Sequence, residues 1–223
     1  MNGAGQKLQC CTGLRSCLGD WSGHGNWHYL CKSSCDSRGS FLSLKQSAKA
    51  ASKIAIVSYN LYWWNVKQNN RFGDIHSRIS GEQPFDLIGF QECEDAQSIV
   101  QGAGMTGFDY YMGPNKPSAN PAPLAWSTSV FEKVSGPGHV KVAQDQYGDR
   151  IMTWVRLRHQ ATGVMVFFAN THGPLGNCGS ELGANWVGAV NDNKEQGDLA
   201  FMTGDFNCGS GSAAMNRMQP PFH

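Results

Sequence analysis

The sequence predicts an α/β fold in which helices flank layered β-sheets of mixed strand direction. Short β-branched runs alternate with amphipathic segments, as in chains that pack helices on sheets. The middle of the chain carries several short apolar runs separated by Gly- and Pro-bearing turns, which is typical of antiparallel hairpins. Hairpins beside alternating strands and helices favour a mixed sheet over an all-parallel one.

Two strands are predicted early in the main domain. Residues 54–60 form a β-branched run that ends on a polar residue, and residues 86–92 form a buried run with an acidic tip. Further strands are predicted from the same signals at 110–111, 124–131, 140–143, 151–158, 164–170 and 199–202.

Three helices are predicted between these strands. Residues 74–83 place Ile75 and Ile79 on one side and stop at Pro84, which cannot continue a helix. Residues 94–101 and 181–194 are the other two helical segments.

The chain divides by composition near residue 50. Its 223 residues are enough for one main domain, and before Ser40 the sequence is rich in Gly, Ser, Cys and Trp without periodicity. We therefore predict a Cys-, Gly- and Trp-rich segment with a linker over 1–50 and the main domain over 51–223.

The cysteines of the first segment leave two interpretations open. Five of the eight cysteines lie within the first 35 residues, a density typical of a disulfide-stapled module in an oxidising, secretory or extracellular compartment. A zinc site with His24 and His28 is the rival, although the paired C-x2-C spacing is missing. The start of the chain has no apolar signal-peptide region, so the localisation is left unassigned. No apolar run is long enough to cross a bilayer.

Polar side chains stand where four predicted strands end, and they are of the kind that hard cations and phosphates require: Asn60; Glu92; Asn170 and His172; Asp205 and Asn207. A formal net charge of +1 gives no field that steers nucleic acid, so a polyanionic substrate must be held by such local groups and a metal ion. Each residue also has a plainer interpretation: Glu92 as a solvated loop acid, His172 as a structural histidine, and the G-D-x-N tetrad as a common turn.

The ordered set of blocks resembles a known family. Ser-Tyr-Asn at 58–60, Asp-Leu-Ile-Gly-Phe-Gln-Glu at 86–92, Asn-Thr-His at 170–172 and Gly-Asp-Phe-Asn at 204–207 are similar to the signature blocks of the endonuclease/exonuclease/phosphatase superfamily. This resemblance implies a DNase I-like sandwich and hydrolysis of phosphoesters, in which water attacks phosphorus with the help of Mg²⁺, or Mn²⁺ as a substitute.

The same resemblance implies a role for each site residue. Glu92 would be the principal metal ligand, with Asn60 beside it, and His172, Asp205 and Asn207 would be catalytic. Phosphate binding is expected of Asn170, Arg150 and Asn207, although Arg150 is an equally good solvated arginine at a strand start.

Two departures from the family pattern limit the expected activity. The segment before residue 124 reads Asn-Pro-Ala-Pro where many members carry a glutamate, and no Asp-His pair follows Asn207. We therefore expect the last strands of the fold to be missing and the chain as written to be weakly active or inactive. A non-catalytic binding protein, or an extracellular interaction module formed by the first segment, are the alternatives.

Two further features bear on the site. Cys178 and Cys208 each follow a motif by a few residues and are predicted to form a disulfide that braces the two loops. Trp63 and Trp64 follow Asn60 and would pack on a base, a sugar or a lipid, with at least one of them buried. The substrate stays open between nucleic acid, a phospholipid headgroup and inositol phosphate.

Overall fold

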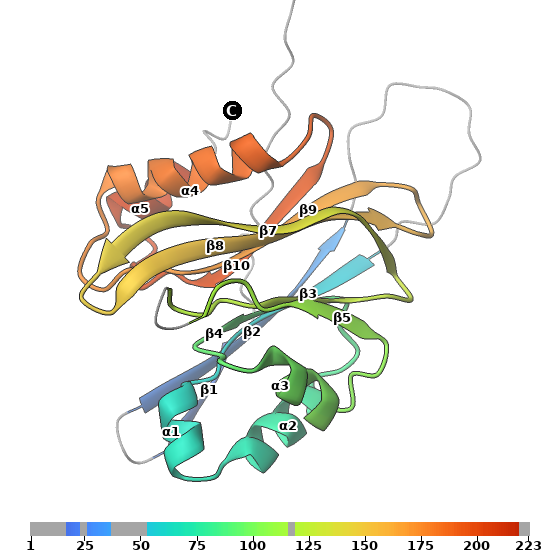
Figure 1. The fold of residues 1–223 in the computed structure, drawn as a ribbon, viewed down its shortest axis with the longest axis vertical. Helices are drawn as coiled ribbons and strands as arrows, with labels where there is room; N and C mark the ends of the chain where they lie inside the picture. The colour runs from blue at the N-terminus through green and yellow to red at the C-terminus, as the bar shows by residue number, and fades with distance from the viewer. Residues whose placement is uncertain (1–16, 23–25, 37–52, 116–118, 219–223) are drawn as a thin grey trace, which may run out of the picture.

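The computed structural model describes residues 17–22, 26–36, 53–115 and 119–218, and their side chains from residue 53 onward (Figure 1). Its strands form two sheets. The first sheet has the order β1-β2-β3-β4-β6-β5, with bounds Cys17–Ser22, Asn26–Asp36, Lys53–Asn60, Leu87–Gln91, Leu124–Ser127 and Phe108–Tyr111. The second has the order β10-β9-β8-β7, with bounds Leu199–Asp205, Met165–His172, Gly148–His159 and Phe131–Asp145.

Both sheets mix strand directions, as predicted. β3 runs parallel to β4 and β9 runs parallel to β10, whereas the other neighbours are antiparallel. The two sheets lie face to face, with α1, α2 and α3 outside the first and α4 and α5 outside the second (Figure 1). The layered α/β prediction is therefore confirmed.

The alternation of side chains along each strand builds the layers. Ile56 and Leu87 face the second sheet, where Phe168 meets them, and together they form the core between the sheets. Their sequence neighbours Val57 and Ile88 face the opposite way, into the core under α1 to α3. This period of two is what a strand buried on both faces requires.

The helices close the outer faces. They span Trp63–Gln68 (α1), Phe72–Gly81 (α2), Ala96–Gly102 (α3), Ser180–Asn193 (α4) and Ala213–Met218 (α5). The three predicted helices are confirmed within two residues at each end, but α1 and α5 were missed. Six residues are too few to show a helical period. None of these helices has the length and apolar character needed to cross a bilayer.

One predicted turn, between residues 131 and 140, lies within a continuous strand. Residues 124–131 and 140–143 were expected as separate strands, whereas β6 ends at Ser127 and β7 runs without a break from Phe131 to Asp145. Glycines let β7 pass the Trp154 ring, because a Cβ at Gly136 or Gly138 would lie within 2.7 Å of that ring. The Gly-Pro-Gly stretch accordingly marks bulges in a long strand.

The first sheet extends into the Cys-rich segment. β1 and β2 lie within 1–50, and β2 pairs antiparallel with β3 of the main domain. No strand was predicted in this part, because its sequence shows no periodicity, and the sheet therefore extends further than predicted. The proposed disulfides and the zinc alternative fall on residues whose side chains lie outside the described part, and the division at residue 50 stays a prediction.

Candidate active site

Two parallel strand pairs deliver the polar residues to one place. β3 and β4 end together, with Asn60 opposite Gln91, and Glu92 follows directly. β9 and β10 also end together, with His172 opposite Asp205. The carboxyl ends of parallel strands share one sheet edge, where the chain leaves the core for loops, so the site arises from the topology.

The Asn60 amide joins two carboxylates. Its Nδ2 group donates to Asp205 Oδ2 at 2.9 Å and to Glu92 Oε1 at 3.3 Å. Its Oδ1 atom accepts from the backbone N–H of Tyr62 at 2.9 Å. Asn60 therefore orients Glu92 and Asp205 through its nitrogen, while its oxygen is engaged by the backbone.

This carboxylate pair suits a hard cation. Among the described residues there is no cluster of three or more His, Cys, Asp or Glu side chains able to hold a metal. A structural zinc site needs such a cluster. Magnesium needs only one or two carboxylates, because it keeps several waters and takes oxygens from its substrate. Glu92 and Asp205, facing one amide, meet that smaller requirement.

His172 and Asn207 complete the edge. The His172 side chain is almost buried, and its Nε2 atom lies 4.0 Å from Asp205 Oδ2. Asn207 donates from its backbone N–H to Asp205 Oδ1 at 3.1 Å and from Nδ2 to Gly173 O at 2.9 Å. Both strand-end loops are therefore tied to Asp205.

Backbone strain is concentrated here. Glu92 and Asn207 have positive φ angles of 52° and 51°, in the left-handed region that non-glycine residues seldom adopt. Such conformations persist only where the surrounding structure enforces them, and they recur at functional sites.

Arg150 enters the site as half of a buried ion pair. Its side chain is 3% exposed and that of Asp145 is 5% exposed. Both Nε and Nη2 of Arg150 donate to Asp145 Oδ2, at 3.0 and 2.8 Å, while Nη1 is buried without a hydrogen-bond partner. The solvated-arginine alternative is therefore wrong. Arg150 also lines the pocket described below, and an unpaired donor on such a residue is a group that an anion can satisfy.

Asp145 is a site residue that the sequence did not reveal. Besides Arg150, its carboxylate accepts from the backbone N–H groups of Tyr147 and Leu175, at 2.9 and 3.0 Å. Burial alone raises the pKa of this carboxyl, but the hydrogen bonds from Arg150, Leu175 and Tyr147 and the charge of Arg150 outweigh it and lower the pKa. Asp145 thus stays ionised and holds the arginine in place.

A pocket of about 450 Å³ opens over these residues. Its polar lining comprises Glu92, Glu94, Asn120, Arg150, His172 and Asn207. Its apolar and aromatic lining comprises Trp63, Trp64, Pro121, Tyr147 and Leu175. The pocket therefore combines acidic, basic and ring-bearing side chains from both sheets.

Asn170 does not fit its predicted role. The residue is fully buried, and its Nδ2 group donates to Phe90 O and Pro123 O, at 2.6 and 2.9 Å. Its Oδ1 atom accepts from Gln91 and Thr203, at 2.7 and 2.9 Å. With every polar group engaged between the two sheets, Asn170 supports the site from below and has no group left for phosphate.

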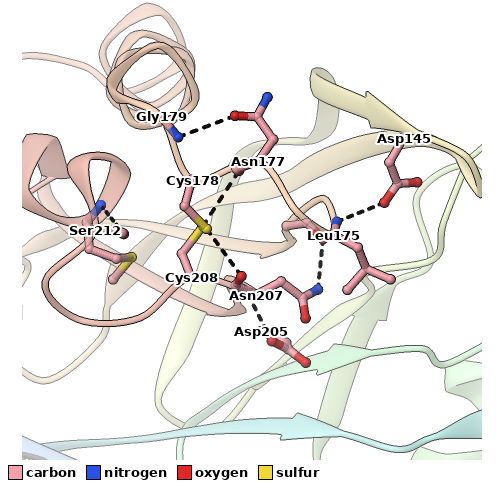
Figure 2. Close-up of a disulfide and its surroundings, with 11 residues drawn as sticks. Asp145, Leu175, Asn177, Cys178, Gly179, Asp205, Asn207, Cys208 and Ser212 are labelled. Carbon is pink, nitrogen blue, oxygen red and sulfur yellow. Dashed lines mark hydrogen bonds between the residues drawn. A yellow bond between two sulfur atoms is a disulfide. The ribbon is translucent and has the colours of Figure 1, made fainter.

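The predicted disulfide is present beside the site (Figure 2). Cys178 and Cys208 are bonded, and Cys208 directly follows Asn207. Their sulfur atoms lie near Asn207 O (3.3 Å) and Asn177 O (3.8 Å), as contacts without hydrogen bonding because a disulfide sulfur carries no hydrogen. The bond therefore fastens the loop after β9 to the loop that carries Asn207.

The cysteine next to Glu92, Cys93, is not a reactive thiol. Among the residues from 53 onward that the structure describes, Cys93 has the only free thiol, and it is fully buried. Burial raises the pKa of this thiol far above its usual range, so it stays protonated and unreactive.

Solved structures share this architecture. An endonuclease/exonuclease/phosphatase family protein from Bacteroides thetaiotaomicron is 20% identical, with a TM-score of 0.61 over 74% of this chain and 66% of its own. A mannosyl-6-phosphatase from the same organism is also 20% identical, with a TM-score of 0.61 over 74% and 69%. TDP2 from D. rerio, complexed with single-strand DNA product, is 15% identical, with a TM-score of 0.58 over 76% and 66%. The chain spans about two thirds of the length of these structures.

The sequence comparison agrees with the fold. The two facing mixed sheets are the architecture shared with these solved structures. The model of the Endonuclease/Exonuclease/phosphatase family matches residues 58–223, and the chain belongs to this family. No curated protein matches the chain.

Proposed function

We propose that this chain hydrolyses phosphoesters with a divalent ion, Mg²⁺ or Mn²⁺, held by Glu92 next to Asp205. The observation that carries the proposal is the convergence of these two carboxylates on one amide, that of Asn60. Arg150 and His172 line the same pocket. When bound, the ion would polarise a phosphoryl oxygen and offset its developing charge.

The phosphate would be held by donors of two residues that line the pocket, Arg150 and Asn207. The open Nη1 group of Arg150 would donate to one phosphoryl oxygen, which removes the cost of a buried unpaired donor. Asn207 has a second Nδ2 hydrogen beyond the one given to Gly173, and it is available to another oxygen. Donors fixed in advance stabilise charge without reorganising during the reaction.

Asp205 and His172 would handle the protons. Asp205 Oδ1 is occupied by the Asn207 backbone, whereas Oδ2 faces Asn60 and His172, and this oxygen would accept a proton from the attacking water. His172 would donate to a phosphoryl or leaving oxygen, since imidazole exchanges protons near neutral pH.

Hydrolysis of bis(p-nitrophenyl) phosphate, with and without Mg²⁺, tests this proposal. We expect product release that EDTA abolishes and that Glu92→Gln and Asp205→Asn each reduce by about 100-fold or more, the usual effect of losing one catalytic group. Glu181→Gln removes an exposed carboxylate on α4 and should leave the rate unchanged. The low absolute rate predicted from the sequence is measured in the same assay.

Three outcomes are informative. Product release that persists in EDTA, or that is equal in the Glu92→Gln and Glu181→Gln proteins, would contradict the proposal. Metal and phosphate binding without any turnover would favour the alternative of a non-catalytic binding protein.

A further inference from the structure

Exposed apolar side chains gather at the proposed phosphate pocket. The described residues expose four large hydrophobic side chains: Trp64 (51%), Val134 (44%), Tyr147 (61%) and Leu175 (45%). Single exposed hydrophobics are ordinary on a protein surface. Three of these four, however, line one pocket: Trp64, Tyr147 and Leu175.

These three side chains come from distant parts of the sequence. Trp64 lies on α1, which follows β3, Tyr147 lies at the turn between β7 and β8, and Leu175 lies in the loop after β9. Tyr62 packs edge-on against the Trp64 ring, with centroids 4.7 Å apart, which helps to fix its orientation. The fold therefore brings these three side chains together at one pocket.

The Asp145 carboxylate fixes two of these exposed residues, Tyr147 and Leu175, relative to Arg150, the proposed phosphate ligand. Asp145 accepts from the backbone of Tyr147 and of Leu175, and it also binds the Arg150 guanidinium. Figure 2 shows the Leu175 backbone nitrogen pointing at this carboxylate. The positions of Tyr147 and Leu175 relative to Arg150 are thus set before any ligand binds.

The pocket is larger than a phosphate and carries little positive charge. At about 450 Å³, it falls within the range of about 300–1,000 Å³ that is usual for small-molecule pockets. Of its described lining residues, Arg150 is the only arginine or lysine, while Glu92 and Glu94 are acidic. A long polyanion needs several cationic contacts. A ligand with one phosphate group on an otherwise uncharged molecule fits the charge of this pocket better.

We infer that the pocket binds a small phosphate ester whose alcohol carries a ring, with the phosphate at Arg150 and the ring face on Trp64, Tyr147 and Leu175. This inference rests on the proposed function and adds a substrate class to it. Aromatic side chains bind a ring face through its apolar surface. The ring is aromatic, as in a nucleotide, or saturated, as in a sugar phosphate, and the test separates the two sources.

Calorimetry in Mg²⁺ with phosphonates tests the inference, because their carbon–phosphorus bond cannot be hydrolysed. Benzylphosphonate carries an aromatic ring, cyclohexylmethylphosphonate a saturated ring, and methylphosphonate no ring. We expect at least one ring-bearing ligand to bind about tenfold more tightly than methylphosphonate, at the lower end of what base stacking contributes. Trp64→Ala and Tyr147→Ala should each reduce that ratio several-fold. Val134→Ala removes the exposed hydrophobic that does not line the pocket, and it should leave the ratio unchanged.

The outcomes separate this inference from the proposed function. Tight methylphosphonate binding with no advantage for either ring, or a ring advantage that survives in both Trp64→Ala and Tyr147→Ala, would overturn the inference and leave the phosphate site intact. If neither methylphosphonate nor inorganic phosphate binds, the proposed function fails first. A preference for the benzyl ligand indicates a nucleotide-like substrate, and equal binding of both rings indicates a sugar-like one.

Discussion

At the scale of single residues, Asp145 links several groups of the site. It receives four hydrogen bonds, two from Arg150 and one each from the backbone of Tyr147 and Leu175. A buried ion pair contributes to stability only when such additional hydrogen bonds satisfy its remaining atoms. The neutral Asn170 side chain is likewise fully hydrogen-bonded, through four bonds to backbone and side-chain groups between the two sheets.

Replacing Asp145 with Asn should destabilise the protein by about 3 kcal/mol at pH 7, since it leaves the Arg150 charge buried without its partner. The lowered pKa of Asp145 gives the loss a pH dependence. The stabilisation is complete above the unfolded-state pKa of about 3.9, and it is lost as the pH falls through the lower folded-state pKa. Urea unfolding at pH 7 and near pH 3 should therefore show a difference between the two proteins that shrinks in acid.

Asp149→Asn is the matched control, because this carboxylate is 35% exposed and pairs with the exposed Lys141. It should cost less than about 1 kcal/mol. An Asp145→Asn effect as small as this, or one of equal size at both pH values, would contradict the role assigned to Asp145.

The sequence identified the residues that end strands, and it failed where partners are distant. Glu92, His172 and Asp205 follow apolar runs in ordered blocks, so they were predictable, and the structure brings them together. Asp145 lies among polar residues of a hairpin, and only the folded chain shows that it faces Leu175. Asn170 was misplaced because a block gives the order of residues but not the direction in which each side chain points.

At the scale of elements, the disulfide joins the two loops that follow β9 and β10. It closes a separation of 30 residues between the loop after β9 and the loop after β10. The linked ends carry Asn207, whose positive φ needs enforcement by its surroundings. Covalent linkage limits the unfolded chain and also holds this loop in the folded one.

The Cys178→Ala, Cys208→Ala double variant should lose about 3 kcal/mol of stability, the typical contribution of a disulfide that closes such a loop. It should also bind inorganic phosphate more weakly, because the Asn207 loop is less restrained. Urea unfolding and calorimetry measure the two effects, and peptide mapping of the parent protein without reductant should find the linked pair. A stability loss below about 1 kcal/mol, together with unaltered phosphate affinity, would show that the disulfide does not restrain the Asn207 loop.

At Gly89 of β4 the two sheets lie too close together for a side chain. A Cβ there would collide with the side chains of Thr203 and Asn170. Gly89→Ala should therefore destabilise the protein by about 3 kcal/mol or more, through overpacking and a broken Asn170 network. Thermal or urea unfolding measures the change.

Gly73 on α2 provides the comparison, because a Cβ there would meet nothing within 4 Å. Gly73→Ala should be neutral or stabilise the protein by up to about 1 kcal/mol. Equal effects of the two substitutions would show that the sheets do not approach as described.

At the scale of the whole molecule, the protein consists of two facing sheets with helices on their outer faces (Figure 1). Each sheet contributes one parallel strand pair, and the two pairs end at the same pocket. Local patterns predicted the strands and the layers because burial imposes a period of two on each strand. They missed the continuous β7 and the N-terminal extension of the first sheet, since Gly- and Pro-bearing or Cys-rich stretches show no such period.

The central claim is that a divalent ion at Glu92 lies beside the phosphate held by Arg150. The most direct measurement is ³¹P relaxation of methylphosphonate while Mn²⁺ is added to the protein, because a paramagnetic ion broadens the signal only of a nearby phosphorus. We predict strong broadening with the parent protein and with Glu181→Gln, and its loss with Glu92→Gln. Broadening that is absent from the parent protein, or unchanged in Glu92→Gln, would contradict the account.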